Sequence, residues 1–187
     1  MPSPLVRDCR YLGRELLTWL WFLCEVEGGS FDLPIGTVEL AIEDDLVLVG
    51  HDDEDSATRV KGGLPPLRPE AASALAAGMT ARQARLLLAR GEREWSFKLD
   101  AETLDLRAVK LPASETEDPF ESLTERLESA HELRQIVDQL YARFIELRLS
   151  DQWDGLEAPR MRSWIRFKLD QSRHEQDQGV TSTRDEA

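Results

Sequence analysis

The sequence predicts an α+β fold: an antiparallel sheet, made of a hairpin and a three-stranded meander, packs on a buried N-terminal helix and on long C-terminal helices. Three observations predict it. Residues 12–24 are the most apolar run of a polar chain. Segments between residues 38 and 112 alternate apolar and polar side chains, as half-buried strands do. Residues 119–169 repeat apolar side chains at helical spacing.

The first helix is expected over residues 12–24, at the centre of the fold. Its apolar side chains recur three or four residues apart and also fill the other faces, with Trp19, Trp21 and Phe22 among them. A helix that is apolar on all sides is buried on most of them. The run is shorter than the roughly 20 apolar residues that span a bilayer. We therefore expect a core helix that ends at the two glycines of residues 28–29.

The next elements are predicted as short strands and one short helix. Residues 38–42 and 46–49 are expected to form a hairpin around the acidic turn at residues 43–45. A further short strand is expected at residues 57–61. Pro69 suits the first turn of a helix, which we expect to end at Gly78.

A three-stranded antiparallel meander is predicted between residues 80 and 112. The clearest strand alternates Trp95, Phe97 and Leu99 with polar side chains. If the strands pair in order, Arg85, Lys98 and Arg107 share the face opposite Trp95 and Phe97. The expected strands are residues 84–88, 95–99 and 104–111.

The C-terminal part is predicted to be helical. Pro119 opens a long amphipathic region that runs to about residue 149, and a basic segment with interleaved aromatic side chains follows at residues 160–173. We expect one domain over residues 9–170. Residues 1–8 and 171–187 are expected to be a flexible N-terminus and a disordered tail.

Charge and cysteine content narrow the functional classes. The chain has 187 residues and a formal net charge of −13, a weak starting point for non-specific nucleic-acid binding unless basic side chains gather on one face. Residues 57–112 carry ten basic and six acidic side chains, whereas residues 113–187 carry ten and 17. Cys9 and Cys24 form no metal or disulfide pattern, which favours the reducing cytoplasm.

No catalytic or metal-binding pattern stands out. His51, His131 and His174 lie far apart without neighbouring ligands, and Asp52–Asp55 lacks the spacing of a calcium loop. These groups are expected to be solvated surface. No nucleophile, base and acid can be placed together. The sequence therefore predicts a protein that is not an enzyme and that uses no metal or cofactor.

The order and spacing of these segments resemble the C-terminal half of the recombination-associated RdgC family. The run Leu-Gly-Arg-Glu-Leu-Leu-Thr-Trp-Leu-Trp-Phe at residues 12–22 is similar to the helix that opens that half. The strands from residues 38 to 61, the helix before Gly78, the meander and the helix after Pro119 follow in the family's order. The resemblance covers about residues 10–150, and the family's N-terminal half has no counterpart in this sequence.

The resemblance implies a fold, a location and partners. Members of the family are bacterial nucleoid-associated proteins that bind DNA with little sequence preference, restrain the RecA recombinase and form a ring-shaped dimer. For this chain it implies an antiparallel α+β fold, a cytoplasmic, nucleoid-associated location, DNA and a recombinase as partners, and a homodimer. It also implies that Arg59 and Lys61 face DNA, although Gly62 and Gly63 replace the polar and basic residues of relatives.

Two functions from different classes remain open. The first is an RdgC-like protein that binds duplex or single-stranded DNA without sequence preference and modulates recombination. The alternative is an acidic adaptor or inhibitor that has kept the fold without DNA binding and whose helices bind a basic protein. Neither involves a membrane. The predicted DNA-binding residues are Arg59, Lys61, Arg85, Lys98, Arg107, Arg160, Arg162 and Arg166.

Overall fold

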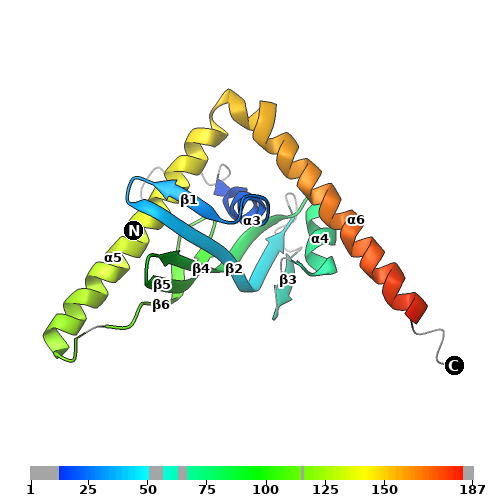
Figure 1. Ribbon diagram of the computed structural model, residues 1–187. Coiled ribbons are helices and arrows are strands. Elements are labelled where there is room, and N and C mark those ends of the chain that lie inside the picture. The colour runs from blue at the N-terminus through cyan, green and yellow to red at the C-terminus, as the bar shows by residue number, and fades with distance from the viewer. Residues whose placement is uncertain (1–12, 51–56, 63–66, 115, 183–187) are drawn as a thin grey trace.

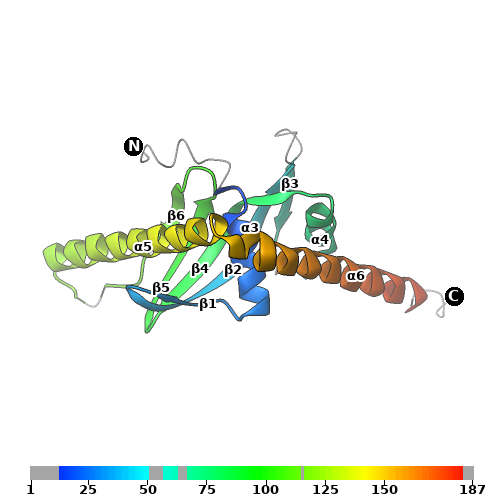
Figure 2. The same ribbon diagram turned by 90° about the horizontal axis from the view of Figure 1, so that it is seen from above.

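A computed structural model describes residues 13–50, 57–62, 67–114 and 116–182 of the chain. It confirms the α+β class: helices cover one face of a six-stranded antiparallel sheet, in which β1, β2, β4, β5 and β6 lie side by side and β3 also pairs with β2 (Figures 1 and 2). The strands are β1 (Ser30–Leu33), β2 (Gly36–Val49), β3 (Ala57–Lys61), β4 (Thr80–Arg90), β5 (Arg93–Asp100) and β6 (Leu106–Lys110). The helices are α3 (Leu16–Val26), α4 (Pro69–Ala76), α5 (Pro119–Arg148) and α6 (Ala158–Ser182), with a π-helical turn η2 (Trp153–Glu157) between the last two.

Helix α3 lies in the core, as the apolar run predicts. All residues from Leu16 to Leu23 are buried, and Trp21 is fully enclosed. The chain leaves the helix through Gly29, which has a φ of 71° and whose N–H and C=O bond to Leu23 and Leu40. A Cβ at this position would lie 2.2 Å from the carbonyl oxygen of Leu40, so only glycine allows so close an approach to β2.

The predicted hairpin at residues 38–49 is wrong, because this segment is one continuous strand. The register of β2 against β4 shifts between Ile42 and Leu46, so the acidic residues 43–45 form an irregularity within the strand rather than a turn. The hairpin lies one step earlier, where β1 pairs with the first residues of β2 from Leu33↔Gly36 to Ser30↔Glu39. The expected strand at residues 57–61 is present as β3.

The meander and the short helix are confirmed. β4, β5 and β6 pair in order, and Trp95 and Phe97 point into the core without solvent exposure. The indole Nε1 of Trp95 donates to Ser129 Oγ of α5 at 2.9 Å, so the sheet is joined to that helix by a buried hydrogen bond as well as by apolar contact. α4 follows Arg68 with Pro69 in its first turn, as expected.

Helices α5 and α6 meet at an angle over the sheet and extend beyond it on both sides (Figure 1). Asp118 caps α5 by accepting hydrogen bonds from the N–H groups of Phe120 and Glu121. Pro159 has no N–H to donate to the preceding turn, which accounts for the wider winding of η2 just before it. α6 continues to Ser182, so residues 171–182 are helical rather than disordered. Residues 1–8 and 183–187 lie outside the described residues.

Two polar networks hold α3 against the C-terminal elements. In the first, Trp19 Nε1 donates to Glu157 Oε1 at 3.0 Å, and Arg160 bridges Glu157 and Glu27 at 3.1 and 2.7 Å. Trp19 also contacts the ring of Phe144. Because the buried Glu157 accepts from an indole N–H and a guanidinium, its charge is paired at the junction, while Arg160 and Glu27 remain partly exposed.

The second network is centred on Glu25 at the end of α3. Lys168 of α6 donates to both carboxylate oxygens at 2.7 and 2.8 Å, and the indoles of Trp21 and Trp164 donate to the same group. Lys168 is only 6% exposed, and its Nζ lies 5.3 and 5.5 Å from the centres of the two indole rings. A basic residue of the C-terminal segment is thus part of the core.

Candidate nucleic-acid interface

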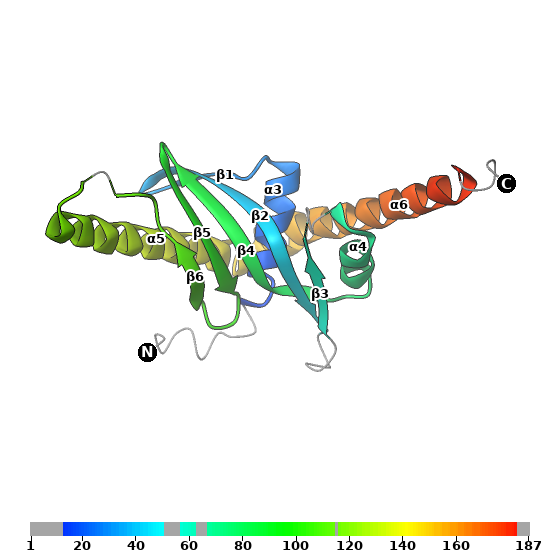
Figure 3. The same ribbon diagram turned by 90° about the horizontal axis from the view of Figure 1, so that it is seen from below.

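One face of the sheet, here called the outer face, is not covered by the helices (Figure 3). Arg85 of β4 pairs in register with Lys98 of β5, and Lys98 pairs with Arg107 of β6. Paired residues in antiparallel strands point to the same side, so the three cations form a row across neighbouring strands, opposite Trp95 and Phe97. The strand order and alternation therefore predicted this row correctly.

Carboxylates from β2 meet these cations on the outer face. Arg59 of β3 donates two hydrogen bonds to Asp45, at 3.0 and 2.8 Å, and Lys98 donates to the same carboxylate. Arg85 Nε lies 3.1 Å from Asp44. The bonds from Arg59, followed by those from Lys98, lower the pKa of Asp45 to about 2, so Asp45 is ionised at neutral pH.

The irregular stretch of β2 explains how the acids reach the row. The register of β2 against β4 shifts between Ile42 and Leu46. This shift breaks the regular alternation of side chains along β2, so Asp44 and Asp45 meet cations of different strands. Glu43 in the same stretch accepts a hydrogen bond from Ser96 of β5 at 2.6 Å. We missed these partners from sequence. The sequence signal against a turn at residues 43–45 was three consecutive acidic residues without a glycine, because tight hairpin turns usually contain glycine.

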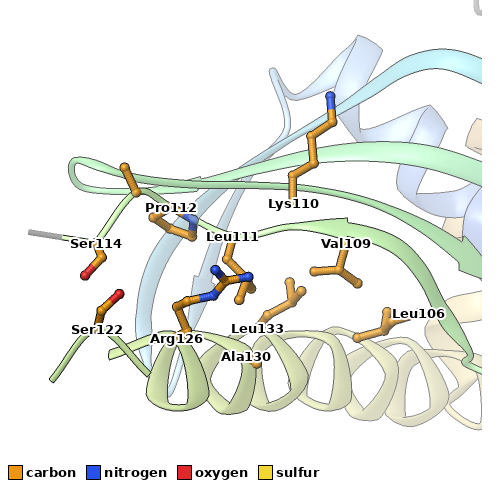
Figure 4. A pocket seen from close by; sticks show the side chains of 11 residues that line it. Leu106, Val109, Lys110, Leu111, Pro112, Ser114, Ser122, Arg126, Ala130 and Leu133 are labelled. Atoms are coloured by element: carbon orange, nitrogen blue, oxygen red, sulfur yellow. The ribbon is translucent and has the colours of Figure 1, made fainter. Parts of the chain in front are cut away.

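The remaining cations of this face are more open. Arg107 has a side chain 64% exposed and a 3.4 Å contact with Asp105, a surface pair of small energetic value. Lys61 and Lys110 are exposed and form no ion pair with any other described residue. Lys110 points away from α5 (Figure 4). The outer face thus has two groups of cations. Lys61, Arg107 and Lys110 are accessible, whereas Arg59, Arg85 and Lys98 form ion pairs with Asp44 or Asp45.

The second predicted basic group lies elsewhere. Arg160, Arg162 and Arg166 belong to α6, which starts behind the sheet and projects past β3 when the outer face is viewed (Figure 3). Arg160 is bound by Glu27 and Glu157 and lies over the ring of Phe22, whereas Arg162 and Arg166 are exposed. The structure therefore does not bring the eight predicted residues together into one surface.

Within the described residues, no group of three or more His, Cys, Asp or Glu side chains is placed to hold a metal ion. Burial and the neighbouring Glu25 raise the pKa of Cys24 to about 12, so its thiol is protonated and unreactive at neutral pH. His51 and Asp52–Asp55 lie outside the described residues. No helix in the described part of the chain is long and apolar enough to cross a membrane.

Comparisons with known proteins do not assign the chain to a family. No protein-family model matches the chain, and no curated protein matches it with significant similarity. The resemblance to the RdgC family therefore stays a prediction from the order of elements.

Proposed function

We propose that this protein is an RdgC-like protein that binds DNA weakly and without sequence preference through the outer face of its sheet. The observation that supports this most is the row formed by Arg85, Lys98 and Arg107 across three neighbouring strands of an uncovered face. Neighbouring strands lie about 4.8 Å apart, so the row spans roughly 10 Å. A row of cations at this spacing can follow phosphates by charge alone, without contacts to base edges.

The carboxylates on the outer face limit the affinity that we expect for DNA. DNA phosphates must compete with Asp45 for Lys98 and with Asp44 for Arg85, and the net charge of −13 repels the nucleic acid. We therefore expect affinities no better than those of ordinary non-specific binders, about 10⁻⁴–10⁻⁶ M at physiological salt. A role at the nucleoid or in recombination belongs to the same proposal and follows from the family resemblance.

The experiment is a titration of labelled duplex and single-stranded DNA, followed by fluorescence anisotropy, at several salt concentrations. The test variant replaces Arg85, Lys98 and Arg107 by alanine, and we expect the log–log salt slope to flatten by roughly 2–3 units. The control replaces the exposed arginines Arg162, Arg166 and Arg173 of α6, which leaves the same net charge. Equal losses in both variants, or no binding by the wild type at low salt, would refute a specific role of the outer face.

An adaptor function is a second candidate, supported by a different observation. The first turns of α5 expose Phe120, Leu123 and Leu127 to solvent within a strongly acidic segment. Large apolar side chains gathered on an exposed helix are typical of protein-binding surfaces. The two functions use different surfaces of the molecule, so variants of one surface test each function separately.

A further inference from the structure

The first part of α5 forms an arm that projects past the sheet (Figure 1). We define the arm as residues 117–128, which are the first turns of α5 and the two residues before it. Phe120, Leu123 and Leu127 are 78, 56 and 64% exposed, although the second half of the same helix buries its apolar side chains in the core. Their spacing of three and four residues places them in one stripe along the helix. More than half of each of these three residues is accessible to solvent.

A groove beside the sheet lies on another side of the same helix. It has a volume of about 480 Å³ and lies between α5 and the segment that follows β6, and its α5 side is lined by Ser122, Arg126, Ala130 and Leu133 (Figure 4). The groove is lined mainly by apolar side chains, with Leu111 and Leu133 at its centre and Arg126 reaching over it. The stripe and the groove thus lie on different sides of the helix, and the stripe alone is here called the arm surface.

Charge identifies the chemistry of the occupant. The arm carries five carboxylates and a single arginine, and Glu121 and Glu128 are exposed in the helical row next to the stripe. Two copies of the chain meeting through their arms would bring like charges together, which opposes self-association. A partner with basic side chains beside its apolar ones would instead be attracted to the acidic row.

We propose that the arm surface binds an amphipathic helix of a partner protein, with Lys or Arg side chains flanking its apolar face. This inference rests on the adaptor function and names its binding surface and the chemistry of its partner. The apolar face of such a helix covers Leu123 and Leu127, while its cations face Glu121 and Glu128. The exposed stripe thereby becomes buried, which provides the main driving force.

The test uses the full chain and a labelled 18-residue helical peptide of Lys and Leu, compared with a scrambled peptide of the same composition. Binding is followed by fluorescence anisotropy. The stripe variant is Leu123→Gln with Leu127→Gln, and its matched control is Leu149→Gln with Leu156→Gln, which changes two leucines that are 70 and 55% exposed near the junction of α5 and α6. A third variant, Glu121→Gln with Glu128→Gln, removes the acidic row. Circular dichroism confirms that each variant is folded.

We expect the wild type to bind the amphipathic peptide about tenfold more tightly than the scrambled one, and the stripe variant to lose about tenfold in affinity while the control keeps it. If the charge variant loses binding but the stripe variant does not, the arm surface is wrong although an acidic adaptor function stands. If the wild type binds neither peptide, both proposals fail. Stripe-dependent dimerisation in sedimentation experiments would show that a second copy is the occupant and would also overturn the inference.

Discussion

Arg59 of β3 and Asp45 of β2 form a two-bond ion pair on the outer face of the sheet, with Nε and Nη2 donating to the two carboxylate oxygens at 3.0 and 2.8 Å. Lys98 of β5 donates to the same carboxylate from the other side. The carboxylate of Asp45 therefore pairs with two of the cations that the sequence predicted to bind DNA. Under the proposed function, Asp45 competes with DNA phosphates for these cations, because a carboxylate and a phosphate accept the same charge-assisted hydrogen bonds.

Replacing Asp45 by Asn is expected to strengthen DNA binding under the proposed function. The change frees Arg59 and Lys98 and removes a repulsive charge, so the salt slope should steepen by about 1–2 units. Anisotropy titrations over a range of salt concentrations measure both slope and affinity. Asp138→Asn on α5 makes the same change of charge away from the outer face and serves as the control. If both variants gain equally, overall charge rather than the released cations explains the effect.

Asp45 is also expected to make stability depend on pH in the acid range. Its pKa is held at about 2 in the folded protein, below the ordinary value of 3.8, chiefly by the hydrogen bonds from Arg59. The unfolded chain therefore binds this proton more readily, so the contribution to stability is complete above about pH 4 and is lost as the pH falls towards 2. Urea denaturation from pH 5 to pH 2 should show a smaller decline for Asp45→Asn than for the wild type. Parallel declines would contradict the lowered pKa.

Trp19 is expected to be essential for stability. It is 1% exposed, packs on Phe144 and donates to Glu157. Trp19→Ala should reduce the free energy of unfolding by about 3–5 kcal/mol. Trp19→Phe keeps much of the packing but leaves Glu157 without its indole donor, and a loss of about 1–3 kcal/mol is expected. Chemical denaturation followed by circular dichroism measures both, with the exposed Phe167→Ala as control. A melt of Trp19→Ala like that of the wild type would mean that α3 does not organise the core.

Lys168→Met is expected to loosen α6. The change removes the two hydrogen bonds that Lys168 donates to Glu25 and leaves that carboxylate with the indoles of Trp21 and Trp164. Bonds to charged groups are worth about 1.5–3 kcal/mol, and the partial exposure of Glu25 places the loss towards the lower end. Limited proteolysis should then cut within α6 sooner than in the wild type or in the exposed control Arg173→Met. Unchanged proteolysis would show that apolar contacts alone hold α6.

The sequence by itself determined the elements whose patterns depend on local order. The apolar run around Trp19 specified a buried helix, because no other placement hides side chains on every side. The alternation around Trp95 and Phe97 specified the meander and the row of Arg85, Lys98 and Arg107, because a strand has a period of two and pairs with its neighbour in sequence.

Only the tertiary structure decided which polar groups are occupied and which apolar ones are free. Asp45 lies on a bulged strand rather than in a turn because β2 pairs with β3 and with β4 around it, and its cations come from strands that are distant in the sequence. Lys168 resembles its exposed basic neighbours, but Glu25 and two indoles enclose it. Leu123 lies on the same helix as the buried Leu133 but is exposed, because it points to a different side of α5 from the residues that pack on the sheet and burial requires a facing surface as well as an apolar pattern.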